Sequence, residues 1–204
     1  MNEVKNLPAS VRQRLLNKAH DSNRPFNEIL QFYAIERFLY RVSLSGYSDQ
    51  FILKGALIFL AWKAEAFRST RDIDFLGYTP NELDTVARII RDICLQEVEP
   101  DGLLFDSASV QSERINQDAD YEGVRVTLLG VLGKIKIPLQ IDIGFADAVY
   151  PAPVTLFYPT ILRMPPPQLR GYTPESVTAE KLHALVILGD ANSRMKDFYD
   201  LWIL

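Results

Sequence analysis

The spacing of hydrophobic residues changes along this chain. It predicts helices first, strands in the middle and helices again at the end. Apolar residues recur every three or four positions up to residue 45, which predicts two helices. The second helix follows Pro25 and is apolar around much of its circumference, so we expect it to pack on both sides. A third helix is expected over residues 56–65.

Alternating apolar residues predict strands between residues 72 and 145. The clearest is 134–145, where Ile, Leu or Phe fills almost every second position and polar residues fill many of the others, as in a half-buried antiparallel strand. Three more strands are expected, over residues 72–76, 103–112 and 122–130. Between them, Thr79 and Pro80 predict a helix start, with Glu82 closing a capping box.

Seven of the 12 prolines fall between Pro151 and Pro174, which predicts an extended connector. A helix is expected from Thr173-Pro174-Glu175 to Gly189, and a last helix from Asn192 or Ser193. The last helix is still apolar at Leu204, which indicates either tight docking or a chain cut from a longer parent.

These elements predict an α/β (α+β) fold, a small mixed sheet flanked by helices. We expect an N-terminal helical extension over residues 1–48, a core over 49–163 and a C-terminal helical region over 164–204.

Composition narrows the class of protein. The 204 residues are 48% hydrophobic and 24% charged, as in an ordinary globular domain. The net charge is −4, yet residues 1–45 hold seven Lys or Arg against four acids. Such a basic helical lobe could help to dock RNA or a partner, although an ordinary solvated helix face explains it equally well.

Several classes of site are excluded by the residues present. One cysteine, Cys94, and two histidines allow neither an internal disulfide nor a conventional zinc site. Cys94 is expected in the core. The chain has no Gly-x-Ser-x-Gly, Gly-x-Gly-x-x-Gly or Walker motif. It has no secretory signal and no apolar run long enough for a membrane, so a cytoplasmic protein is expected.

The most informative segment is Arg68–Phe75. In an extended strand, Asp72 and Asp74 point to the same side while the apolar residues between and after them enter a core. Two adjacent like charges favour a counter-cation, and a divalent metal with oxygen ligands would serve. The alternative is an Asp-x-Asp pair on a solvent-facing strand edge.

Other polar residues also stand in unexpected positions. Asp142 lies late in the 134–145 strand, where aspartate is disfavoured, so it is a candidate third carboxylate or else a solvated residue. Lys181 interrupts an apolar helical stripe, which indicates either snorkelling or an anion such as phosphate. Arg194 and Asp197 share one helix face and could form an internal salt bridge.

With these residues in this order, the chain resembles the AbiEii/AbiGii-type nucleotidyltransferase toxins, a branch of the polymerase-β-like nucleotidyltransferase superfamily. The resemblance covers roughly residues 50 to 204. Four blocks carry it: Leu53-Lys54-Gly55-Ala56 with Arg68–Phe75, Ile137–Phe145, Val177-Thr178-Ala179-Glu180-Lys181-Leu182, and Ser193–Leu201.

The resemblance implies a role for each matching residue. Asp72 and Asp74 would hold Mg²⁺, and Asp142 would complete the carboxylate set or lie beside it as base or orienter. The remaining site residues would contact the nucleotide. These are Gly55 near the phosphates, Ser69 or Thr70 in the same region, Lys181 on the triphosphate, and Asp197 as an essential acid positioned by Arg194.

The activity implied is Mg²⁺-dependent transfer of a nucleoside monophosphate from an NTP to a macromolecular hydroxyl. The acceptor end of tRNA is favoured, with a protein hydroxyl second. A growth-inhibiting toxin with a cognate antitoxin protein is expected, and no membrane partner. Two alternatives remain open: a metal-dependent nuclease, and a non-catalytic partner-binding module on the same scaffold.

Overall fold

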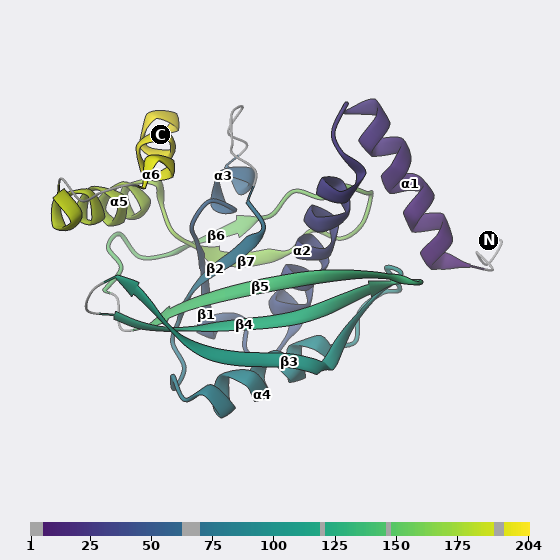
Figure 1. Cartoon of the computed structure of the whole chain (residues 1–204), viewed down its shortest axis with the longest axis horizontal. Coiled ribbons are helices and arrows are strands. Elements are labelled where there is room, and N and C mark those ends of the chain that lie inside the picture. Colours follow the sequence, from purple (N-terminus) through teal and green to yellow (C-terminus); the bar gives the residue numbers. More distant parts are fainter. Residues whose placement is uncertain (1–5, 63–69, 119–120, 146–147, 190–193) are drawn as a thin grey trace.

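A single seven-stranded mixed sheet forms the centre of the structure, in the order β3-β4-β5-β2-β1-β7-β6 (Figure 1). The computed structural model describes residues 6–62, 70–118, 121–145, 148–189 and 194–204. The strands are β1 Phe51–Lys54, β2 Asp72–Gly77, β3 Leu103–Asp118, β4 Tyr121–Leu132, β5 Ile135–Phe145, β6 Val154–Phe157 and β7 Gln168–Gly171. The expected α/β fold is confirmed.

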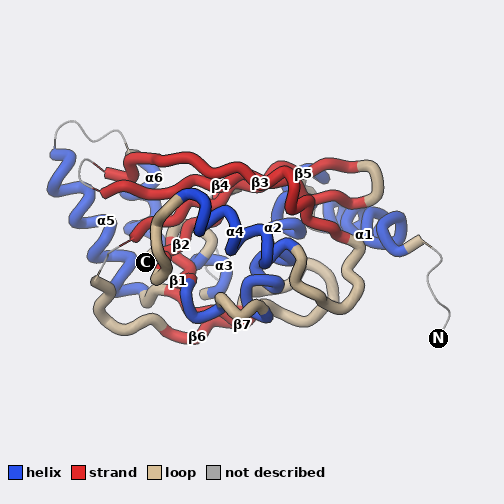
Figure 2. The backbone as a smooth tube through the Cα atoms, turned by 90° about the horizontal axis from the view of Figure 1, so that it is seen from below, coloured by secondary structure: helices blue, strands red, loops and turns tan. Residues whose placement is uncertain are grey.

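The helices cover the sheet and extend beyond it. They are α1 Leu7–Asp21, α2 Phe26–Leu44, α3 Ile58–Ala61, α4 Leu83–Cys94, α5 Pro174–Leu188 and α6 Met195–Ile203, with a short 3₁₀ helix at Ser48–Gln50. Figure 2 shows α2 and α4 over one face of the sheet, and both helices contact its strands. In both views α1 lies at the opposite end of the molecule from α5 and α6.

The predicted double-sided packing of α2 is confirmed. Its buried residues include large apolar side chains such as Tyr33 and Phe38, and also charged ones. The alternation of β5 is confirmed too, since Ile137, Leu139 and Ile141 enter the main core. Cys94 is buried as expected.

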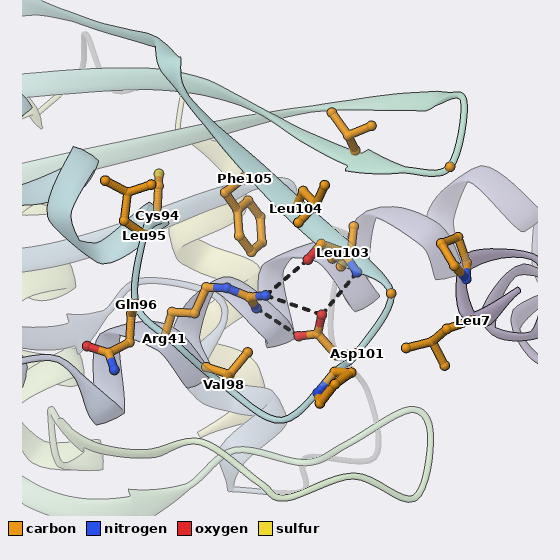
Figure 3. A pocket seen from close by; sticks show the side chains of 15 residues that line it. Leu7, Arg41, Cys94, Leu95, Gln96, Val98, Asp101, Leu103, Leu104 and Phe105 are labelled. Carbon is orange, nitrogen blue, oxygen red and sulfur yellow. Dashed lines mark hydrogen bonds and ion pairs between the residues drawn. The ribbon is translucent and has the colours of Figure 1, made fainter. Parts of the chain in front are cut away.

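An ion pair in the interior joins α2 to the chain before β3 (Figure 3). The Arg41 guanidinium donates to both carboxylate oxygens of Asp101, at 2.8 and 3.2 Å, and to the carbonyl of Leu103 at 3.1 Å. Asp101 Oδ1 also accepts the N–H of Leu103. The two charged side chains are only 5% and 3% exposed, so the charges depend on each other for compensation.

Two predicted helices differ from the structure. The helix expected from Thr79 begins instead at Leu83, because Glu82 is extended (ψ 135°) and makes no side-chain cap. The Thr79 hydroxyl is buried without a hydrogen-bond partner in the described part of the chain, so the predicted capping box is wrong. The helix expected over residues 56–65 is limited to α3, and residues 63–69 lie outside the described residues.

The proline-rich segment contributes two strands where a connector was expected. β6 and β7 pair antiparallel, and β7 pairs parallel with β1. The expected domain boundary after residue 163 therefore falls between two paired strands. The predicted start of α5 is confirmed, because the Thr173 hydroxyl accepts the N–H of Ser176 and Gly189 follows the helix with φ 47°.

Within the described ranges, no helix combines the length and apolar character needed to cross a bilayer.

The buried pair gives a stability prediction. We expect Asp101→Ala to lower the free energy of unfolding by about 3–5 kcal/mol, because it leaves the buried Arg41 charge without its carboxylate partner. The measurement is urea unfolding followed by circular dichroism. Arg88→Ala is the matched control. It breaks an Arg–Asp pair whose side chains are 60% and 46% exposed, and should cost under about 0.5 kcal/mol. Equal destabilisation of the two variants would contradict the prediction.

Candidate nucleotide and metal site

Four charged side chains form a row across four neighbouring strands. Arg125 of β4 pairs in register with Asp142 of β5, Asp142 with Asp74 of β2, and Asp74 with Lys54 of β1. Directly paired residues project to the same face of a sheet, with Cβ atoms about 4.5–5.5 Å apart. The row therefore reads positive, negative, negative, positive.

Asp72 lies two residues before Asp74 and shares its face. Its register partner on β5 is Gln140. The residues that alternate with these acids, Ile73 and Phe75, are fully buried in the main core. The predicted shared face of Asp72 and Asp74 is thus present, and the parallel pairing of β2 with β5 adds Asp142 to it.

Asp74 has a charged neighbour on each side in the row, Lys54 on β1 and Asp142 on β5. Burial raises the pKa of its carboxyl to about 6, Lys54 opposes this, and the neighbouring Asp142 and Asp72 raise the pKa further. Lys196 of α6 lowers it slightly. The two neighbouring carboxylates make this a site of crowded negative charge that a cation would relieve.

Gly55 packs directly against this carboxylate. It has φ +68°, and a Cβ at this position would overlap the Asp74 side chain. Only glycine adopts this backbone without strain. Gly55 is therefore required for close approach of the turn after β1 to Asp74. Thr70, just before β2, is buried, and Ser69 lies outside the described residues.

Arg125 engages Asp142 with a two-pronged contact. Its Nε donates to Asp142 Oδ1 at 2.8 Å and its Nη2 to Oδ2 at 2.8 Å. Gln140 Nε2 adds a longer contact of 3.3 Å to Oδ2. The hydrogen bonds to Asp142 are also the main reason that the pKa of Arg125 is raised.

Arg125 and Lys54 have no functional role in the sequence-based prediction. A signal for Arg125 does exist, because Gly133 fixes the hairpin so that Leu132 pairs with Ile135. Arg125 lies seven residues before Leu132, and Asp142 lies seven residues after Ile135. In this antiparallel register the two residues must therefore face each other. Lys54 pairs with Glu180 of α5 at 2.5 Å, a contact between distant segments that no local pattern predicts.

Lys181 is neither snorkelling nor exposed to an anion from solution. It is buried between α5 and α6, where its Nζ donates to Asp197 at 2.9 Å and to Asp200 at 2.8 Å. Arg194 Nε lies 2.7 Å from the other oxygen of Asp197, so the predicted Arg194–Asp197 contact is present. Asp200 was not singled out from the sequence.

Much of the apolar surface of α5 and α6 is exposed, although Val177 and Ile203 pack in a small core cluster, while the charges of Lys181, Asp197 and Asp200 lie between the helices. Several large apolar residues of the pair are exposed: Leu182, Val186, Ile187, Met195, Phe198, Tyr199, Trp202 and Leu204. This order is the reverse of ordinary helix packing in water.

The donor set of the row suits a hard divalent cation. Mg²⁺ prefers carboxylate oxygens and water, and the three aspartates supply carboxylates on adjacent strands. The described residues contain no group of three or more His, Cys, Asp or Glu already arranged to hold a metal ion. Arg125 donates to both oxygens of Asp142 and places a positive charge beside them, so a cation that binds all three acids meets opposition from this contact.

Gly55 provides a test of the site geometry. Gly55→Ala should lower the free energy of unfolding by about 1–2 kcal/mol, because it forces an L-residue into a left-handed conformation, and the new Cβ should displace the Asp74 carboxylate. Gly46→Ala is the control, since a Cβ there meets nothing within 4 Å. Urea unfolding measures both. No difference between the two variants would refute the tight contact.

Comparisons with known proteins place this fold. Curated proteins gave no match. Two solved structures match, each with 17% identity over 83% of this chain: JHP933 from Helicobacter pylori, with TM-score 0.52, and a candidate nucleotidyltransferase from H. pylori, with TM-score 0.50. The chain covers 64% and 66% of their lengths, slightly less than two thirds. At this identity the likeness shows the fold alone.

A family profile described as nucleotidyl transferase AbiEii toxin, type IV TA system, matches residues 37–204. The match includes the charged row and the α5–α6 pair, and it spans well over half of the chain. The chain therefore belongs to the AbiEii nucleotidyl transferase toxin family.

Proposed function

We propose that this protein transfers a nucleoside monophosphate from an NTP to a macromolecular hydroxyl, with Mg²⁺ as cofactor. The observation that carries the proposal is the strand register, which sets Asp142 directly beside Asp74 with Asp72 on the same face. Adjacent carboxylates on rigid strands are a recurrent arrangement for metal-assisted displacement at phosphorus. Family membership supports the same reaction class.

The reaction is an in-line displacement. The acceptor hydroxyl oxygen forms a bond to the α-phosphorus, the bond from that phosphorus to the β-phosphate bridging oxygen breaks, and pyrophosphate leaves with the electron pair. Asp72, Asp74 and Asp142 would hold Mg²⁺, which when bound neutralises phosphate charge. Asp142 would otherwise act as the base that takes the hydroxyl proton or orients the nucleophile.

Positive charge for the triphosphate lies beside the acids, although Lys54 is already paired with Glu180. Lys54 and Lys196 both lie near enough to lower the pKa of Asp74. Lys181 was predicted to contact the triphosphate, but two carboxylates already hold its Nζ. In our proposal, Lys181 therefore reaches phosphate only after exchanging one of these partners.

A long polyanion is the favoured acceptor. Arg12, Arg14 and Lys18 are exposed on α1, at the opposite end of the molecule from α5 and α6 (Figure 1). An acceptor that uses both this basic helix and the charged row must span much of the protein, which favours tRNA over a small molecule. A cognate antitoxin is the proposed partner, in keeping with the toxin–antitoxin family.

The central test uses α-³²P-labelled NTPs, Mg²⁺ and tRNA. We expect wild-type protein to lengthen tRNA and the activity of Asp74→Asn to fall by more than the roughly 10–100-fold typical of an outer-shell substitution. At pH 7.5 the free energy of unfolding of Asp74→Asn should equal or exceed that of wild type. The raised pKa means that ionised Asp74 costs the fold free energy, and this cost grows as pH rises from the ordinary value of 3.8 to about 6 and stays constant above that.

Asp84→Asn is the control, because Asp84 is exposed on α4 and lies outside both the charged row and the basic helix. Shortened tRNA would instead indicate a nuclease. If NTP neither binds nor reacts, the non-catalytic module is supported. Full turnover by Asp74→Asn would exclude the proposed site.

The basic helix gives a separate prediction. Replacing Arg12, Arg14 and Lys18 with alanine should weaken tRNA binding and reduce its salt dependence by about one unit of log–log slope for each phosphate-binding side chain removed. NTP affinity should stay unchanged, because these residues do not belong to the charged row. Fluorescence anisotropy of labelled tRNA across a salt series measures the slope. A slope identical to that of wild type would mean that α1 does not bind the acceptor.

A further inference from the structure

Asp142 is held by a bidentate contact from one arginine in the structure. Arg125 takes both of its carboxylate oxygens, at 2.8 Å each. Since Asp142 also neighbours Asp74 in register, the guanidinium supplies positive charge at the edge of the acidic row. A planar guanidinium matches a carboxylate and a phosphate equally well, because both offer two oxygens to its parallel N–H groups.

The two members of this pair differ in accessibility. The Arg125 side chain is 34% exposed, whereas that of Asp142 is 12% exposed. The Nη1 atom of Arg125 takes part in neither hydrogen bond to Asp142, so the guanidinium has a further donor to offer an anion. The buried Arg41–Asp101 pair is different, because its members are 5% and 3% exposed and the arginine also binds a backbone carbonyl. Arg125 is therefore placed to exchange partners.

We propose that Arg125 is a positioning residue that couples metal binding to the arrival of the triphosphate. In the free protein it holds Asp142. When phosphate oxygens take the guanidinium, Asp142 is released to the metal beside Asp74. This inference rests on the proposed function, since it assigns the triphosphate and the metal to the same row.

The coupling has a thermodynamic signature. Arg125 competes with the metal for Asp142 but assists the phosphate, so its removal must shift the two affinities in opposite directions. If Arg125 only stabilised the fold, its removal would lower both affinities together. The sign of each change therefore separates the two roles.

The test measures two bindings by isothermal titration at pH 7.5. Mn²⁺ is titrated alone, and inorganic triphosphate is titrated in the presence of EDTA. We expect Arg125→Ala to bind Mn²⁺ at least about fivefold more tightly than wild type, and triphosphate at least about fivefold more weakly. Arg88→Ala, which removes another arginine paired with an aspartate, should leave both affinities unchanged.

Circular dichroism confirms folding of each variant. If Arg125→Ala does not fold, Arg125→Lys serves instead, because it keeps the charge but cannot make the two-pronged contact. It should show the same opposite shifts with smaller size.

Parallel changes, or no change, in the folded variant would overturn the coupling. Absence of Mn²⁺ binding in wild type, or Mn²⁺ binding that survives Asp74→Asn, would overturn the proposed site and the coupling together. Labelled transfer by wild type with unaltered Mn²⁺ affinity in Arg125→Ala would overturn only the coupling.

Discussion

The register of four neighbouring strands is the constraint on which the site depends. A slip of one residue would turn every side chain of a strand to the other face, moving acids into the core and Ile or Phe into water. The hairpin turn at Gly133 fixes β4 against β5, and the parallel pairing of β5 with β2 then brings Asp142 beside Asp74. The same buried apolar residues that hold the sheet together therefore also assemble the carboxylates.

Charge compensation is the second theme of the structure. Three buried acids near the site already have a cation: Asp142 has Arg125, while Asp197 and Asp200 share Lys181. Lys54 joins β1 to α5 through Glu180. A ligand entering this region must therefore exchange partners with existing ion pairs. Its net binding free energy will be smaller than the new contacts suggest, and its selectivity will depend on charge and geometry.

Local periodicity predicted the helices α1, α2 and α5, the alternation of β5 and the common face of Asp72 and Asp74. It failed where distant segments decide. The strands β6 and β7 lie in a proline-rich segment whose pairing comes from β1, and the start of α4 follows the extended backbone at Glu82. Lys181 was recognised as anomalous, but its partner Asp200 comes from another helix. The roles assigned to the site residues stay predictions.

The exposed apolar residues of α5 and α6 have a consequence for the behaviour of the protein in salt. Strongly hydrated anions such as sulfate strengthen the association of apolar surfaces. The ion pairs of Lys181 with Asp197 and Asp200 are buried, so salt screens them little. Trp202 and Val186 lie on the outside of the helices, so sulfate favours association of the chain through these surfaces. Sulfate should thus precipitate this chain at lower concentrations than chloride does, through the very helices that carry its buried charges.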